Sequence, residues 1–237
     1  NDDLDSNYQT QSARKATISP KLNVLFNANQ NIQVYLKAGK GFHSNDTRVS
    51  VAQNGKQILP SSYGSDIGLI VKPTPKLLMN VGFWHLYLEQ EFVYVGDAGI
   101  VEPSGKTQRL GVDFGFRYQP LDWLLFDTDL SYSHARAVDE ANGENYIPLA
   151  PDLTLSGGIY VDHSSGFYSS LKYKYVKDRP ANEDNSIVAE GYCIVDFNAG
   201  YTWRNLTFGV EINNLFNSNW NETQFATESR LQNELQP

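Results

Sequence analysis

The side chains best suited to hold a small molecule lie in the long polar segments of the chain rather than in its apolar stretches. These segments combine charged groups and amides, which hydrogen-bond to a ligand, with aromatic rings that can enclose it. The chemistry they indicate is therefore non-covalent binding. The candidate ligand contacts are Phe42, His43, Asn45, Asp46, Arg48, Tyr94, Asp97, Arg179, Asn182, Trp220 and Asn221.

Two local arrangements resemble parts of hydrolytic sites. Asp129 lies shortly before His134, and His163 is followed directly by Ser164 and Ser165. Such neighbours are common in polar loops, and the sequence has no phosphate-binding loop, nucleophile elbow or zinc signature. We therefore expect no catalytic residue. The alternative, a ten-stranded barrel hydrolase, would lose its activity on changing Asp129 or His134.

The residue types that usually bind metals are scattered along the chain. The four histidines, His43, His85, His134 and His163, lack the spacing of a metal site. Cys193 has no second cysteine with which to pair. The sequence therefore predicts neither a metal site nor a cofactor.

Charge and hydropathy exclude two classes of protein. The 237 residues contain 19 Lys and Arg against 27 Asp and Glu, and the net charge of −8 is the opposite of the basic face that binds nucleic acid. The mean hydropathy is −0.43, and no apolar run approaches the roughly 20 residues of a membrane-spanning helix. Aromatic residues make up 13% of the chain, which favours strands over helices.

Alternation of apolar and polar residues is the dominant pattern. From 110 to 118 every even position is apolar or aromatic, whereas the odd positions are glycine or charged. Because successive side chains of a strand point to opposite faces, this pattern predicts strands with one apolar face. In 76–95 the apolar phase slips, which suggests a bulge near Trp84. The ten predicted strands are 14–28, 31–43, 64–73, 76–95, 105–119, 121–136, 149–163, 166–177, 188–203 and 205–216.

The connections between these strands alternate in length. Short turns are expected at 28–30, 74–75, 119–120, 164–165 and 204–205, and long polar loops at 44–63, 96–104, 137–148 and 178–187. Short turns on one rim and long loops on the other are typical of an outer-membrane barrel. A β-sandwich, a propeller or a lipocalin-like cup would also show alternation. Strand length and the aromatic residues near strand ends, such as Tyr118 with Trp123 and Tyr201 with Trp203, favour the membrane barrel.

In such a barrel the polar face of each strand lines the lumen. We expect the charged residues on this face to line a wet interior rather than to have individual ligand roles. These residues are Lys37, Arg109, Asp113, Arg117, Asp127, Asp129, Lys172, Lys174, Asp196 and Glu211.

Several motifs, in this order and spacing, resemble those of the TonB-dependent receptors of the bacterial outer membrane. They are Ser19-Pro20-Lys21-Leu22-Asn23, 36–43 (LKAGKGFH), 94–97 (YVGD), 109–113 (RLGVD) and 210–217 (VEINNLFN). The last is the most telling, because it is similar to the family's approach to its final strand. The resemblance spans essentially the whole chain and implies the C-terminal half of a 22-stranded barrel, with these ten strands as strands 12 to 21.

The resemblance also implies a function. Receptors of this family take up a scarce ligand, such as an iron chelate or cobalamin, with energy from the inner membrane. The implied partners are an extracellular small molecule, the lipid bilayer and the energy-coupling protein TonB, reached through an N-terminal region. We expect residues 1–237 to be a partial barrel, with the plug domain and the final strand outside the chain. The alternative is a passive pore or structural barrel without a plug.

Overall fold

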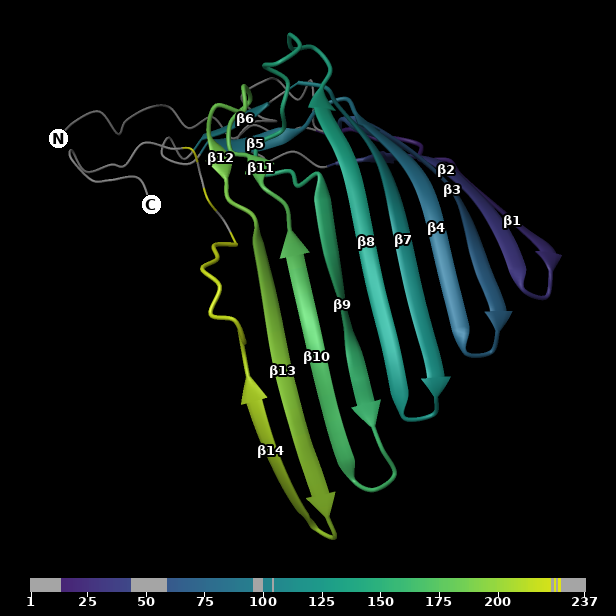
Figure 1. Ribbon diagram of the computed structural model, residues 1–237. Helices are drawn as coiled ribbons and strands as arrows, with labels where there is room; N and C mark the ends of the chain where they lie inside the picture. Colours follow the sequence, from purple (N-terminus) through teal and green to yellow (C-terminus); the bar gives the residue numbers. More distant parts are fainter. Residues whose placement is uncertain are drawn as a thin grey trace, which may run out of the picture.

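The protein folds as one curved antiparallel sheet (Figure 1). The computed structural model describes residues 14–43, 59–95, 100–103, 105–222, 224 and 226. The sheet has ten strands in the order β1-β2-β3-β4-β7-β8-β9-β10-β13-β14, so each pairs with the next of the ten along the chain. The number and order of the ten predicted strands are thereby confirmed, whereas several of their bounds differ. Their bounds are β1 Lys21–Asn29, β2 Ile32–Phe42, β3 Ser61–Thr74, β4 Leu77–Leu88, β7 Thr107–Leu121, β8 Leu124–Ala137, β9 Leu153–Asp162, β10 Phe167–Val176, β13 Tyr192–Trp203 and β14 Leu206–Ile212.

The two ends of the sheet differ, as the alternating connections predict. Tight turns join the strands at one end, the lower end in Figure 1. The opposite end, which we call the loop rim, carries two short hairpins. One pairs β5 (Phe92–Val95) with β6 (Ile100–Pro103), and the other pairs β11 (Arg179–Pro180) with β12 (Val188–Ala189). No helix in the described part of the chain is long and apolar enough to cross a membrane.

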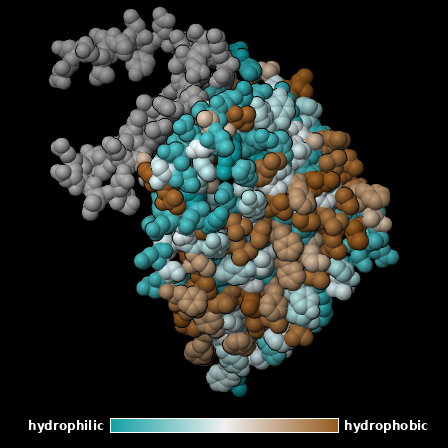
Figure 2. Space-filling view, turned by 45° about the horizontal axis from the view of Figure 1, so that its top comes forward, coloured by the Kyte–Doolittle hydropathy of each residue, from teal (hydrophilic) through white to brown (hydrophobic). Residues whose placement is uncertain are grey.

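One face of the sheet is apolar and exposed. The register places Val81, Phe114, Leu130 and Leu155 side by side on it, and Figure 2 shows hydrophobic side chains gathered over a broad area away from the loop rim. Many large apolar side chains of the described residues are exposed, whereas the buried apolar residues are few and mostly small. A soluble sandwich or cup would bury its apolar faces in a core. This face is therefore suited to contact lipid.

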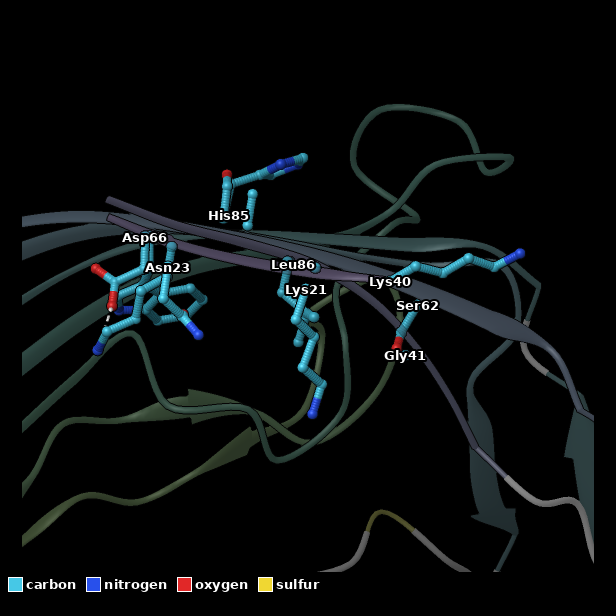
Figure 3. Close-up of a pocket in the computed structure, with 14 residues that line it drawn as sticks. Lys21, Asn23, Lys40, Gly41, Ser62, Asp66, His85 and Leu86 are labelled. Carbon is cyan, nitrogen blue, oxygen red and sulfur yellow. Dashed lines mark ion pairs between the residues drawn. The ribbon is translucent and has the colours of Figure 1, made fainter. Parts of the chain in front are cut away.

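The opposite face, which we call the inner face, is polar. Figure 3 shows Lys21, Asn23 and Leu86 on this side of the sheet and His85 on the other. The register assigns to it every charged residue that the sequence places in a lumen. Neighbouring charges pair along it: Lys37 Nζ lies 3.7 Å from Asp66 Oδ2, and Arg117 Nη2 lies 4.0 Å from Asp127 Oδ2.

The predicted bulge near Trp84 is wrong. The register of β4 runs without interruption against β3 and β7 at this position. Trp84, Leu86 and Leu88 are apolar residues on the inner face, in line with Gly111, Arg109 and Thr107 of β7. The alternation of apolar and polar residues is interrupted because apolar side chains occupy the inner face here, and not because the strand contains an extra residue.

Several boundaries also differ from prediction. Strand β1 begins at Lys21 rather than at 14, β9 begins at Leu153 rather than at 149, and β14 ends at Ile212 rather than at 216. The strand expected over 188–203 is divided into β12 and β13.

The strand expected over 76–95 ends at Leu88, and Phe92–Val95 forms the separate strand β5. The turn expected at 119–120 lies at 122–123, and Pro120 is inside β7, where the register shifts between Tyr118 and Leu121. Proline has no N–H to donate to the ladder, so it is tolerated at such an irregularity.

Aromatic rings on the inner face lie across glycines of the neighbouring strands. Tyr35 of β2 is in register with Gly68 of β3 and Gly82 of β4, and its ring occupies the space that a side chain at Gly68 would fill. Tyr168 of β10 lies in the same way over Gly200 of β13. These glycines are required for close approach rather than for backbone conformation.

Candidate ligand-binding site at the loop rim

A concentration of polar contacts at the loop rim forms where the chain leaves β14. This strand has seven residues, whereas its partner β13 has twelve. Asn214, two residues after the end of β14, has a φ of 53°, a conformation that asparagine tolerates better than most residues. Its backbone N–H donates to Asp196 Oδ1 at 2.8 Å, and its side-chain oxygen accepts from the backbone N–H of Ser218 at 2.8 Å. Residues 213–222, which we call the rim segment, therefore run up towards β11 and β12 (Figure 1).

Glu222 of the rim segment is bound by side chains from two strands. Lys174 Nζ of β10 donates to both carboxylate oxygens at 3.0 Å, and the hydroxyl of Tyr192 at the start of β13 donates to Oε2 at 2.7 Å. The ring of Trp220 packs on that of Tyr192 with centroids 5.5 Å apart. Together with Arg179 these residues form the rim cluster: Lys174, Arg179, Tyr192, Trp220 and Glu222.

Arg179 is the buried cation of the rim cluster. It lies on β11 and is 5% exposed. Its Nη2 donates to the backbone oxygen of Glu222 at 2.8 Å, whereas its buried Nη1 has no hydrogen-bond partner in the part of the chain that the structure describes. A buried charged donor without a partner is costly. The cluster therefore has a cationic group with unused capacity to bind an acceptor.

The hydrogen bonds to Glu222 favour its charged form. The bond from Tyr192 and the bonds from Lys174 hold the pKa of the Glu222 carboxyl below its usual value, against a smaller effect of desolvation. A lowered folded-state pKa means that the attachment is complete above the ordinary glutamate pKa of about 4.3 and is lost as the pH falls through the lowered value. The contact that joins Glu222 of the rim segment to Lys174 and Tyr192 of the sheet is thus sensitive to acid.

This attachment gives a pH prediction. We expect the fluorescence of Trp220, measured in a protein whose Trp84, Trp123 and Trp203 are changed to Phe, to shift in a single step below pH 4.3 as protonation of Glu222 loosens Tyr192 from it. Tyr192→Phe removes the largest contribution and should move the midpoint to higher pH. An unchanged midpoint in that variant would contradict the assignment.

The structure brings together only some of the predicted site residues. Arg179 and Trp220 meet in the rim cluster. Asn182 lies in the turn between β11 and β12, where it donates to Ser186 Oγ at 2.8 Å and accepts from the backbone N–H of Ile187 at 3.1 Å, so it shapes the hairpin. Asn221 is exposed in the rim segment.

The remaining candidates lie elsewhere. Phe42 ends β2, and the register places its side chain on the apolar face. The exposed His43 follows it and donates its backbone N–H to Pro60 at 3.1 Å. Tyr94 lies in β5, opposite Val101. Asn45, Asp46, Arg48 and Asp97 lie outside the described residues.

Sequence reasoning missed Tyr192 and Glu222 as site residues. Lys174 was expected on the polar face, but without a partner at the rim. Glu222 is 30 positions from Tyr192 and 48 positions from Lys174 in the sequence, although both bind its carboxylate. The signal available in the sequence was a carboxylate two positions after Trp220, in the polar stretch that follows the Asn-Leu-Phe motif.

A hollow lies on the inner face of β1 to β4, away from the rim cluster (Figure 3). It has a volume of about 430 Å³, and the Lys37–Asp66 ion pair lies along it. Its polar lining residues include Lys21, Asn23 and Ser62. This hollow belongs to the charged wall rather than to the loop rim.

Of the two hydrolytic arrangements, one is kept apart by the sheet and the other is a contact within a turn. Asp129 is on the inner face and His134 is on the apolar face, so the sheet separates them. His163 Nδ1 lies 2.9 Å from Ser165 Oγ and also accepts the backbone N–H of Ser165 at 3.2 Å. Both bonds lie within the tight turn between β9 and β10 and therefore shape it. Among the described residues no group of three or more His, Cys, Asp or Glu is placed to hold a metal ion.

The sheet is similar to parts of solved receptor barrels. The ferric-catecholate import receptor Fiu from E. coli K12, in its closed form, matches with a TM-score of 0.68 and 18% identity over 86% of this chain and 31% of its own. The ferric citrate transporter FecA, unliganded, matches with a TM-score of 0.69 and 16% identity over 84% and 33%. The copper transporter OprC matches with a TM-score of 0.65 and 16% identity over 84% and 33%. The chain thus spans about a third of the length of these receptors.

A family comparison extends this likeness from fold to sequence. No curated relative matches the chain. The family described as "TonB dependent receptor-like, beta-barrel" matches residues 1–215, which is most of the chain. Its members are outer-membrane transport receptors rather than enzymes. Together with the ten-stranded sheet, its lipid-facing side and its polar inner face, this match shows that the chain belongs to the TonB-dependent receptor family and forms part of a β-barrel in the bacterial outer membrane.

Proposed function

We propose that the chain is a ligand-binding part of the barrel wall of a receptor that imports a scarce small molecule, with an iron chelate as the first candidate. The energy for import is supplied through TonB. The observation that carries this proposal is the rim cluster, which sets cationic donors and aromatic rings on the inner face next to the loops. Such a combination can bind an anionic chelate from the medium.

The structural neighbours support the choice of ligand class. Their titles describe import or transport of ferric catecholates, ferric citrate and copper. The sequences are under 20% identical to this chain, so they support a metal-bearing ligand without selecting one. A cobalamin would belong to the same class of scarce ligands. The plug and the contact with TonB would come from parts of the receptor outside the chain.

Within this proposal, Arg179 and Trp220 are the principal ligand contacts from the described residues. Asn182 and Asn221 would act from the adjoining loops. His43 and Tyr94 belong to other segments of the loop rim and are proposed as further contacts, whereas the side chain of Phe42 is on the apolar face and is not. Asn45, Asp46, Arg48 and Asp97 lie outside the described residues and stay predictions from the sequence.

Uptake measurements test the function. Cells that depend on the complete receptor for iron should accumulate radiolabelled iron from a panel of ferric citrate and ferric catecholates, and a protonophore or loss of TonB should reduce the uptake at least tenfold. Cells with an empty vector give the background. Uptake that persists without the proton gradient would favour a passive pore, and the proposal would be withdrawn.

A further inference from the structure

We propose that the rim cluster is a carboxylate-binding site that Glu222 occupies in the free receptor, and that a carboxylate-bearing ligand binds by replacing the Glu222 side chain. The inference rests on the proposed function only in that the ligand reaches this face. It adds a defined subsite, a chemical class of ligand group and an internal competitor.

The geometry around Glu222 is that of a bound carboxylate. Its two oxygens accept three bonds from Lys174 and Tyr192, at 3.0, 3.0 and 2.7 Å. These donors come from neighbouring strands of the rigid sheet, and both are on its inner face. Charge-assisted bonds of this length are the usual means by which proteins bind carboxylates. A ligand carboxylate in the same place would make the same three bonds.

Arg179 shows that Glu222 does not use all of the site. The guanidinium is almost fully buried, but its contact with Glu222 is through the backbone oxygen and not through the carboxylate. Among the described residues Nη1 has no partner. A guanidinium can bind a carboxylate with two parallel bonds, so a ligand that brings a further acceptor would satisfy a donor that this part of the chain leaves unpaired.

The internal competitor is held weakly enough to be exchanged. The side chains of Lys174 and Glu222 are 50% and 59% exposed, and exposed ion pairs of this kind stabilise a protein only slightly because water screens the two charges. The backbone of the rim segment is fixed by other bonds. Asn214 anchors its start, and Gln224 exchanges two bonds of 3.0 Å with the backbone of Glu190 beyond its end. Replacement therefore needs only a rotation of the Glu222 side chain.

Citrate binding to the purified full-length receptor tests the inference. Citrate should change the tryptophan fluorescence, whereas sodium chloride at the same ionic strength should not, and Trp220→Phe should abolish the change because the ring of Trp220 packs on that of Tyr192. Glu222→Gln removes the competing charge and should tighten citrate binding about fivefold. Lys174→Gln should weaken binding at least fivefold.

Glu140→Gln is the matched control. It removes the same charge from an exposed loop residue outside the rim cluster and should leave the citrate affinity unchanged. Each variant must keep the heat-modifiable gel mobility of a folded barrel. If Glu222→Gln binds citrate no more tightly than the parent, or if Glu140→Gln tightens binding equally, the inference is overturned.

The same variants separate this inference from the proposed function. Citrate binding is measured without an energy source, so it does not depend on TonB. Tight binding by Glu222→Gln in a receptor that imports nothing would refute the uptake proposal and keep the subsite. Energy-dependent uptake together with an unresponsive Glu222→Gln variant would refute the subsite and keep the uptake proposal.

Discussion

Leu130→Arg is expected to lower the free energy of unfolding of the receptor in phospholipid vesicles by about 2–4 kcal/mol. Leu130 lies in the middle of β8 on the apolar face, between Phe114 of β7 and Leu155 of β9. An arginine here would have to hold its charge in the hydrocarbon region, where no paired group is available. Urea titration of the full-length receptor, followed by gel mobility, measures the change.

Ser131→Arg is the control for this prediction, because the next residue along β8 points to the inner face. Ser131 Oγ donates to Asp113 Oδ1 at 2.6 Å, so an arginine at 131 would meet a carboxylate and water. We expect a change of less than about 1 kcal/mol. Equal losses for the two variants would mean that the two faces do not differ in environment, which would contradict the membrane assignment.

Gly68→Ala is expected to destabilise the barrel by about 1–3 kcal/mol. A Cβ atom at Gly68 would collide with the ring of Tyr35, which then has to leave the surface of β3. The hydroxyl of Tyr35 would also lie only 2.7 Å from a Cβ atom at Gly82, so the ring cannot slide towards β4 without a new contact. The same unfolding measurement applies.

Gly64→Ala is matched to Gly68→Ala in strand and face. The nearest atoms to a Cβ at Gly64 are 3.9 Å away, an ordinary contact, so this variant should keep the parental stability or gain a little. Adding Tyr35→Ser to Gly68→Ala should recover part of the loss, since it removes the colliding ring. A loss at Gly64 as large as that at Gly68 would refute the steric explanation.

The ten strands could be predicted because lipid and water on the two faces impose the alternation directly on the sequence. The prediction failed where only one face is constrained. The apolar face must be apolar, whereas the inner face accepts Trp84, Leu86 and Leu88 as well as charges. Apolar residues on both faces were therefore misread as a bulge. Pro120 was misread as a turn because proline marks both turns and irregular strand positions.

The site was less predictable than the strands. Arg179 and Trp220 could be named from residue type and position in polar segments, but the carboxylate that joins them could not. Glu222 meets Lys174 through the pairing of β10 with β13 and through the path of the rim segment, which is set by Asn214. Sequence alone does not give that path. The role of Asn182 in shaping its hairpin is likewise visible only from its hydrogen bonds.

The aromatic rings that lie across glycines also determine the clearance inside the barrel. A tyrosine that stood upright on the inner face would project by the length of its side chain, whereas Tyr35 and Tyr168 fold down onto neighbouring strands. Each of these rings therefore adds less height to the inner face than an upright tyrosine would. The wall can therefore carry bulky aromatic residues without narrowing the lumen by their full length. A molecule that moves along the inner face would meet little steric obstruction from these side chains.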